Sequence, residues 1–558
     1  MNKLKPKLFS VMKQYTKEQF VKDVIAGIIV AIIALPLSIA LAIASGVNPE
    51  RGLYTAIIAG FIISFLGGSR VQIGGPTAAF VVIIYGIIEK YGMDGLILAT
   101  IMAGIILVIM GCLKFGSLIK FIPYTITTGF TAGIAVGIFA GQIKDFMGLQ
   151  MGAVPSEFIE KIKAYAEHIT TVQPVTLAIG MLALLILIFW PKLTDKIPGS
   201  LIAIVVTTLV VQLCKLDVST IGSVYGELSS SLPKFSLPNV DFKTVKELLS
   251  PAFTIAVLAG IESLLSCLVS DGMIGSQHRS NMELVAQGVG NIFSGLFGGI
   301  PATGAIARTA ANVKNGGRTP IAGMVHAITL LLILVILMPT AALIPMPTLA
   351  AVLIMVAWNM CGIGEFIRLI KTSPKSDIIV LLTTFFLTVI FDLVVAIEIG
   401  MVLAAVLFMK RMAEVTDMSG WVYEDEEKEE DFNDPMSIQL KSVPRDTVVY
   451  EINGPMFFGA ADKFMEITKE EMLATKRGKI RKIILRMRSV PAMDATAMHT
   501  LHNVFNICKK KKITLILSHV QKQPYKVMEK AGFIDMVGSE NICKNIDKAL
   551  ERAAQIKA

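Results

Sequence analysis

The stretch of residues 298–309 interrupts a strongly apolar part of the sequence with three glycines, Pro301 and Arg308. Glycine and proline break helices and arginine is costly in lipid, so a spanning helix would rarely contain this mixture. We expect an extended segment that runs to about Pro301, followed by a short helix with that proline at its first position. The dipole of this helix, with Arg308 about two turns along, predicts an anion site inside the membrane. The alternative is a kinked helix whose Arg308 reaches a lipid headgroup.

A second copy of the pattern lies at residues 67–79, at an offset of 231 residues (298 − 67). It again has paired glycines, an extended stretch and a proline, Pro76, that opens an apolar helix. Interrupted apolar segments at corresponding places in two halves are typical of transporters, and they mark the substrate site.

Composition supports a membrane protein. Of the 558 residues, 17% are charged, whereas a soluble protein has about 25%. The apolar segments number seven in each half, and an odd count predicts halves that are inverted relative to the membrane. The expected spans are residues 24–44, 53–66, 76–88, 96–112, 124–140, 175–189 and 200–213, then 251–269, 282–296, 303–313, 321–338, 347–360, 377–390 and 393–409. The fold class is therefore an all-α polytopic membrane domain with half-helices as its third and tenth segments, followed by an α/β domain.

Charge and composition divide the chain into three parts. Residues 1–415 form the transmembrane domain, 416–435 an acidic linker, and 436–558 a soluble α/β domain. In this last part 22 lysines and arginines face 12 aspartates and glutamates, a balance of +10. The basic N-terminus and the even number of spans predict that both termini are cytoplasmic, in a cell inner membrane. The basic run 509–512 suggests either nucleic acid or, more simply, an anionic inner leaflet.

Neither an enzyme nor a cofactor protein is expected. The six cysteines have no metal-ligand spacing, and no nucleophile and base form a recognisable pair. The expected partners are a small inorganic anion and the lipid bilayer, without nucleic acid.

The chain resembles bacterial members of the sulfate permease family, whose animal relatives include prestin and pendrin. The resemblance rests on residues 51–56, 68–70, 75–78, 261–265, 281–284 and 308–312, and on a tail that is similar to a STAS domain at 454–459 and 493–496. It implies secondary transport of small anions by an elevator-like motion of a core (spans 1–4 and 8–11) against a gate (spans 5–7 and 12–14), usually in a homodimer. In regulatory proteins that share the STAS domain, a serine is phosphorylated at the position of Ala495, so phosphate regulation is not carried over.

Glu262 is the ionisable residue that we single out for coupling. It lies midway along the eighth span, where a carboxylate is costly unless it is protonated or paired. In sodium-coupled bicarbonate relatives the matching residue is typically aspartate, helped by a hydroxyl at the position of Ile306. The departure favours a proton, although Ser266, one turn after Glu262, keeps sodium as an alternative. A structural ion pair between Glu262 and Arg308 is a further alternative.

Two other carboxylates, Asp392 and Glu398, are rival proton carriers. The resemblance places the first span at the site, although Leu37 and Leu41 stand where relatives often have glutamine or an aromatic residue. The predicted substrate-binding residues are Leu37, Leu41, Pro76, Thr77, Ala78, Thr303, Gly304, Ala305, Ile306, Ala307 and Arg308, with Glu262 and Ser266 for coupling.

The sequence therefore predicts a secondary active transporter of small inorganic anions. The favoured substrate is sulfate, and the favoured co-transported ion is a proton. The alternatives are a bicarbonate or dicarboxylate transporter coupled to sodium or protons, an anion exchanger, and, more remotely, a nucleobase permease. Nucleobase permeases share the inverted fold but tend to carry acidic residues on both the eighth and the tenth span.

Overall fold

The computed structural model describes most of the chain, and two compact units emerge from its contacts. These are a membrane unit, Met1–Val402, and a C-terminal unit, Leu403–Ala558, and each is described by itself. The described residues are 4–117, 123–152, 154–155, 157–194, 198–226, 228–238, 241–391, 393–415, 417–422, 443–444, 446–457, 474–475 and 478–556.

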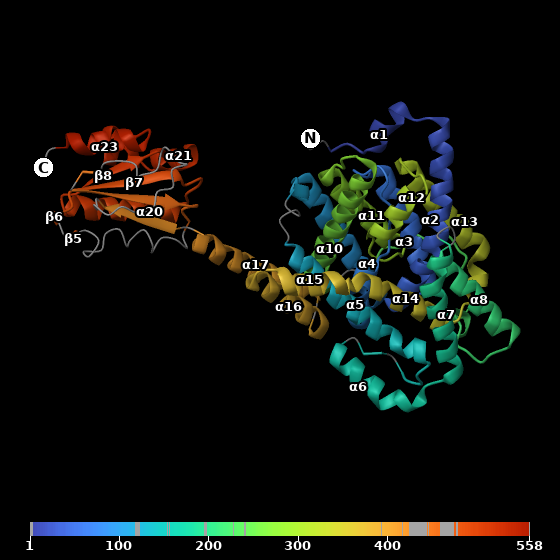
Figure 1. The fold of residues 1–558 in the computed structure, drawn as a ribbon. Coiled ribbons are helices and arrows are strands. Elements are labelled where there is room, and N and C mark those ends of the chain that lie inside the picture. The colour runs from blue at the N-terminus through green and yellow to red at the C-terminus, as the bar shows by residue number, and fades with distance from the viewer. Residues whose placement is uncertain are drawn as a thin grey trace. The chain divides into compact units, whose positions relative to one another are not determined.

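The membrane unit is helical (Figure 1). Its α-helices are α1 (Leu8–Val11), α2 (Lys17–Ala44), α3 (Pro49–Leu66), α4 (Val81–Cys112), α5 (Tyr124–Met147), α6 (Phe158–His168), α7 (Pro174–Leu193), α8 (Gly199–Leu213), α9 (Ile221–Tyr225), α10 (Phe242–Ile274), α11 (Ser280–Leu296), α12 (Ile306–Lys314), α13 (Pro320–Ala341), α14 (Met346–Cys361), α15 (Ile363–Thr372), α16 (Lys375–Ile390) and α17 (Leu393–Val415), which crosses into the second unit. A short 3₁₀ turn, η2 (Ala78–Phe80), precedes α4.

All fourteen expected apolar segments correspond to helices. Among the described residues, eight helical segments are long and apolar enough to cross a membrane. The third and fourth expected segments are joined in α4, which is kinked at Gly92, where φ is 64°. Glycine adopts this left-handed conformation without steric cost, so a break lies between the two expected segments. The sequence analysis missed the amphipathic α6 and α15, whose polar faces conceal their apolar residues.

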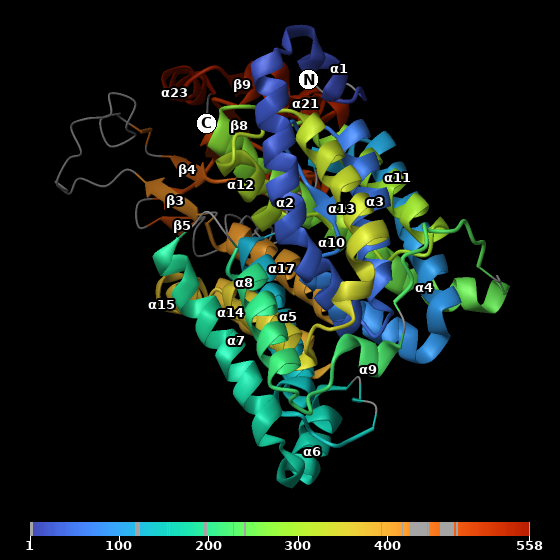
Figure 2. The ribbon, with the colours of Figure 1, turned by 90° about the vertical axis from the view of Figure 1, so that its right-hand side faces the viewer.

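The membrane unit is built from packed groups of helices. Helices α2, α3 and α13 lie side by side in both views (Figures 1 and 2), and α4 packs against α10 and α11. Helix α5 packs against α14 and α16, and α7 against α8. Fully buried Asp23 fastens α2 to the start of α13, because it accepts hydrogen bonds from the backbone of Arg318 (2.8 Å) and the hydroxyl of Thr319 (2.6 Å).

The C-terminal unit contains a five-stranded sheet in the order β3-β4-β7-β8-β9. The strands are β3 (Asp417–Val422), β4 (Thr447–Asn453), β7 (Lys482–Ser489), β8 (Thr514–Ser518) and β9 (Ile542–Cys543), and a separate ribbon pairs β5 (Ala474–Thr475) with β6 (Gly478–Lys479). The helices are α20 (Ala495–Lys510), α21 (Lys522–Lys530), α22 (Phe533–Val537) and α23 (Ile546–Gln555). Strands β4, β7, β8 and β9 are parallel, as strands joined by helices require.

Strand β3 lies within residues 416–435, the segment that we expected to be a linker. It pairs antiparallel with β4 along its whole length, so these six residues extend the sheet. These residues, Asp417 to Val422, show no regular alternation of polar and apolar side chains, so the sequence predicted no strand beside the acidic run that follows. The sequence of this unit also predicts strands at 446–452, 480–486 and 513–519 and helices at 461–474 and 497–510. The three strands and the second helix are present, and the first helix falls outside the described residues except for its last position.

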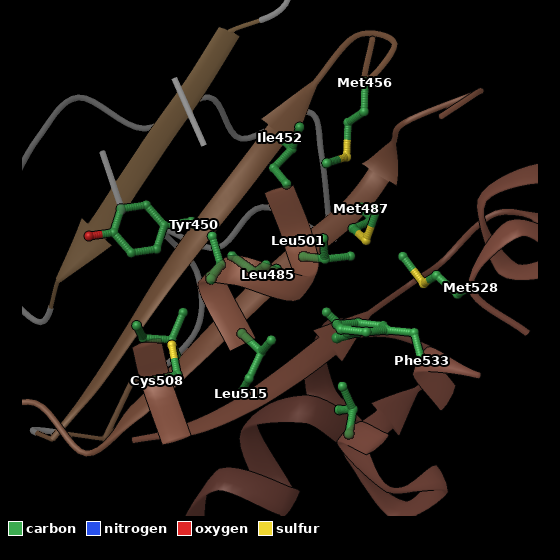
Figure 3. Close-up of a cluster of buried hydrophobic side chains, with 14 of the residues drawn as sticks. Tyr450, Ile452, Met456, Leu485, Met487, Leu501, Cys508, Leu515, Met528 and Phe533 are labelled. Carbon is green, nitrogen blue, oxygen red and sulfur yellow. The ribbon is translucent and has the colours of Figure 1, made fainter. Parts of the chain in front are cut away.

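The core between the sheet and α20 is apolar (Figure 3). Ile452 and Leu485 come from strands, Leu501 from α20 and Phe533 from α22, and all are at most 2% exposed. Burial in this core raises the pKa of the Cys508 thiol to about 11, so the thiol stays protonated and acts as a packing residue.

Candidate functional site

The two broken segments meet in the middle of the membrane unit and pair with each other. The two-residue strands β1 (Gly74–Gly75) and β2 (Thr303–Gly304) are antiparallel, with Gly74 opposite Gly304 and Gly75 opposite Thr303. The ladder continues where the backbone N–H of Ala305 donates to the carbonyl of Ile73 at 2.9 Å. These bonds satisfy backbone groups that an interrupted helix leaves open, and such groups need partners within the protein wherever lipid replaces water.

The second broken segment differs from the expectation in where its helix begins. We expected the helix to start at about Pro301, but the chain stays extended through Ala305 and α12 begins at Ile306. The pairing of Thr303 and Gly304 with β1 holds the backbone extended beyond the proline. As a result, Arg308 lies in the first turn of α12, where the helix dipole is strongest, and not two turns along.

Neutral side chains hold the second segment in place. Fully buried Asn291 on α11 both accepts from the N–H of Ala302 and donates to its carbonyl, each at 2.8 Å. The hydroxyl of Thr55 accepts from the N–H of Ile300 at 2.7 Å, and Ser294 donates to the carbonyl of Ile300 at the same distance. An amide or a hydroxyl suits this segment, because it must serve both a donor and an acceptor.

A carboxylate holds the first segment. Glu283 on α11 has no exposed surface and accepts from the N–H groups of Gly68 (2.8 Å) and Ser69 (3.0 Å). Its other oxygen accepts from the side-chain amides of Gln72 (3.0 Å) and Gln287 (2.9 Å). A carboxylate can be buried only when hydrogen bonds of this kind satisfy it, so Glu283 fixes the entry to β1.

Arg308 lies where the two segments meet, and only 1% of it is exposed. Its Nη2 donates to the carbonyl of Pro76 at 3.2 Å, whereas Nε and Nη1 have no partner among the described residues. A Cβ on Gly75 would lie 2.6 Å from Nη1, so glycine lets the guanidinium approach the strand this closely without shifting. A buried guanidinium with two free nitrogens is suited to bind an anion, which supplies the missing acceptors.

Glu262 on α10 faces the first segment. Its Oε2 accepts a hydrogen bond from the hydroxyl of Thr77 at 3.0 Å. The Thr303 hydroxyl donates to the carbonyl of Ala259, one turn earlier on α10. The structure thus brings α10 and both broken segments together, but the described residues contain no ion pair between Glu262 and Arg308, whose one partner is Pro76.

Ser266 takes part in a separate buried chain of hydrogen bonds. Its hydroxyl donates to that of Thr309 at 3.2 Å, and Thr309 accepts from the N–H of Ile73 at 3.1 Å. The Ser266 hydroxyl therefore joins α10 to α12. At the start of α12, Ile306 is 43% exposed and Ala307 is exposed as well, so this turn borders open space.

The remaining predicted site residues do not all lie around the same place. Pro76, Ala78, Gly304 and Ala305 are buried around the place where the two broken segments pair, which we call the crossing. Leu41 is 1% exposed. Leu37 instead lines a largely apolar cavity of about 760 Å³ between α2, α7, α8 and α14. Of the rival proton carriers, Glu398 is exposed on α17 and Asp392 lies outside the described residues.

Sequence reasoning missed Glu283, Asn291 and Thr55 as residues that build the site. Their positions in the sequence carried one signal, since Thr55 and Glu283 both fall in stretches used for the family resemblance. Each of them holds the backbone of a distant segment, and no local pattern shows which distant backbone a side chain will contact. Among the described residues, no group of three or more histidine, cysteine, aspartate or glutamate side chains could hold a metal ion.

Paired broken segments around a buried cation, within a bundle of apolar helices, are the architecture of a secondary transporter. Solved structures share the fold. The structure of SLC26A9 matches with a TM-score of 0.85 and 17% identity, over 98% of this chain and 92% of that one. The transmembrane domain of a cyanobacterial bicarbonate transporter, BicA, matches with a TM-score of 0.63 and 30% identity, over 68% of this chain and 98% of that one.

The family follows from the sequence comparisons. The model of the sulfate permease family matches residues 20–384, and that of the STAS domain matches residues 437–549. The putative sulfate transporter YvdB of Bacillus subtilis (strain 168) is 40% identical over 537 residues, which cover 96% of this chain and 98% of YvdB. The bicarbonate transporter BicA of Picosynechococcus sp. is 28% identical over 542 residues, which cover 95% and 94%. The chain belongs to the sulfate permease family, and the predictions of a multi-pass membrane transporter, of a STAS domain and of a protein that is not an enzyme are confirmed.

Proposed function

We propose that this protein is a secondary active transporter that carries sulfate across the cytoplasmic membrane together with a proton. The observation that carries the proposal is Arg308, buried at the junction of both broken segments with two guanidinium nitrogens free. An oxyanion fits the planar fork of a guanidinium, which presents parallel N–H donors. The substrate would lie at Arg308 and at the first turn of α12, where Ile306 and Ala307 border open space.

Coupling to a proton is proposed for Glu262. An anion bound near an ionised Glu262 would be repelled by about 3 kcal/mol at a separation of about 5 Å and an effective dielectric of about 20. Protonation removes that repulsion, so anion and proton would bind cooperatively and cross together. The hydroxyl of Thr77 can donate to the ionised carboxylate, as it does here, or accept from the protonated form.

Sodium coupling remains the competing mechanism, and bicarbonate the competing substrate. The similarity to BicA, over nearly the whole of both chains, favours bicarbonate as the second candidate. Sodium prefers several oxygen ligands, but the hydroxyl of Ser266 is engaged with Thr309 and the start of α12 carries Ile306. These two features support a proton. We further propose a homodimer with cytoplasmic termini, and an elevator-like motion in which the paired segments move as one body.

The experiment is uptake into proteoliposomes that contain the full chain. Labelled sulfate and labelled bicarbonate are offered in turn, under a pH gradient, a sodium gradient or neither. We expect sulfate to accumulate under the pH gradient alone. Glu262→Gln imitates the protonated state, so it should still bind sulfate and exchange internal for external sulfate, but lose accumulation.

Three results would contradict parts of the proposal. Accumulation by Glu262→Gln under a pH gradient would remove Glu262 as the coupling group. A wild-type protein that responds to sodium and ignores pH would overturn proton coupling. Uptake of bicarbonate without uptake of sulfate would replace the substrate.

A further inference from the structure

A polar cavity of about 270 Å³ lies apart from the crossing of the broken segments. It is bordered by the ends of α2 and α5, the start of α4, and parts of α6, α9 and α14. Water takes about 30 Å³ per molecule, so the cavity has room for a small oxyanion together with several waters. Its polar lining comes from Tyr85, Gln142, Lys144, Asp145, Lys161 and Tyr225.

The position of this cavity places it next to the substrate site along α4. Val81 and Val82 line it, and they follow directly after η2, which begins at the predicted site residue Ala78. On the other side it is bordered by Ala44, the last residue of α2, and by Gly46. The cavity therefore lies between the crossing and the face of the membrane unit at which α2 ends.

Ammonium groups reach the cavity from two elements. Lys144 on α5 donates to the carbonyl of Gly152 at 2.8 Å, and Nζ of Lys161 on α6 lies 6.0 Å from the centre of the Tyr85 ring. The Tyr85 hydroxyl donates to the carbonyl of Val154 at 2.6 Å, which fixes the ring as part of the wall. These contacts hold both lysines beside the cavity and leave further N–H groups for a ligand.

Two negative groups oppose this positive charge, one inside the lining and one outside it. Asp145 is the carboxylate in the lining, and Glu89 is an exposed carboxylate that acts on Lys161. Burial lowers the pKa of Lys161, because its ammonium has lost part of its hydration. An anion would restore that stabilisation, and the lining residues alone carry one positive charge in excess, from two lysines and one aspartate.

We propose that this cavity is an auxiliary anion site, where a small oxyanion is held by Lys144 and Lys161 before it reaches Arg308 or after it leaves. The inference rests on the proposed function, because it assigns a step on the path of the same substrate. An excess of positive charge in the lining of a cleft raises the local concentration of an anion and its rate of entry, and salt weakens this effect. The site should thus increase kcat/KM at low ionic strength without taking part in the coupling step.

The test compares sulfate uptake by cells that express the full chain and lack other sulfate uptake. We expect Lys161→Gln and Lys144→Gln each to lower kcat/KM by about three- to tenfold at low ionic strength, with a smaller difference at high ionic strength. Lys163→Gln is the matched control, since Lys163 lies on the same helix but is exposed to solvent. It should leave kcat/KM unchanged.

A variant of opposite sign separates electrostatics from structural damage. Asp145→Asn removes the negative charge of the lining, so it should raise kcat/KM at low ionic strength. Wild-type kcat/KM in both lysine variants would overturn the auxiliary site, as would a loss that is the same at every ionic strength. A wild-type chain that transports no sulfate would instead contradict the proposed function.

Discussion

The two broken segments meet in one short ladder, yet they are built from different chemistry. The first, from Gly67 to Phe80, is held by the carboxylate of Glu283. The second, from Gly298 to Lys314, brings the cation Arg308 and is held by the neutral side chains of Asn291, Thr55 and Ser294. Sequence symmetry therefore does not extend to electrostatic symmetry.

This difference separates two tasks. The second segment supplies the positive charge that can bind an anion, and the first supplies Thr77, which contacts the carboxylate of Glu262. If binding and coupling are divided between the segments in this way, substitutions in one should affect affinity and substitutions in the other should affect the response to pH.

The largest effect is expected at Arg308. Removing one member of a buried pair between an ion and its ligand commonly costs about 2–5 kcal/mol, so Arg308→Ala should weaken sulfate binding at least about 30-fold. Arg308→Lys should be impaired as well, because an ammonium lacks the planar fork. Binding to the purified protein is the measurement, with Arg318→Ala, four residues beyond the end of the segment, as the control cation. Wild-type affinity in Arg308→Ala would break the division of tasks.

The second effect tests the charged anchor of the first segment. All four neighbours of the Glu283 carboxylate are hydrogen-bond donors, so Glu283→Gln would set its own N–H₂ against them. Each buried donor left unpaired costs about 1–3 kcal/mol, and the thermal midpoint in detergent should fall by several degrees. Glu18→Gln, at a carboxylate whose side chain is 79% exposed, should change nothing. An unchanged midpoint in Glu283→Gln would show that the first segment does not depend on a charged anchor.

A smaller effect is expected at two glycines of the ladder, Gly75 in β1 and Gly304 in β2. The Cβ in Gly75→Ala would press on Nη1 of Arg308, whose side chain can shift, so sulfate affinity should fall about tenfold with little loss of stability. The Cβ in Gly304→Ala would instead meet the amide of Gln72, which is bonded to Glu283 and Cys267. This variant should lose stability first. Measuring both affinity and the thermal midpoint distinguishes the two, and identical behaviour would argue against separate roles.

The smallest effect is expected at two threonine hydroxyls. Thr77→Val removes the donor that stabilises ionised Glu262, so the proton should be retained to higher pH. A hydrogen bond is worth about 0.5–1.5 kcal/mol, which corresponds to a shift of the pH profile of uptake by roughly 0.4–1.1 pH units upward. Thr303→Val removes a bond to the carbonyl of Ala259 and should leave the profile in place. A shift in Thr303→Val alone would reverse the assignment of coupling to the first segment.

The sequence was sufficient to locate both breaks and to single out Arg308 and Glu262, because glycine, proline and charge are rare within apolar spans. It was not sufficient to place the start of α12, since the backbone partners of Thr303 and Gly304 belong to a segment some 230 residues away (304 − 74 = 230). The same reason hid the role of Glu283. The interpretation of residues 416–435 as a linker overlooked β3, because this edge strand is held by its backbone pairing with β4 and not by a pattern of its own.

The register between Gly74 and Gly304 also has a consequence for biosynthesis. During synthesis at about 5–20 residues per second, the first segment waits roughly 10–50 s for its partner to be made. Through that interval β1 lacks its ladder, and Glu283, the anchor of the first segment, itself emerges only shortly before β2. Assembly of the crossing is therefore a late event, and the first half of the chain is expected to need protection within the bilayer until α11 and α12 have been inserted.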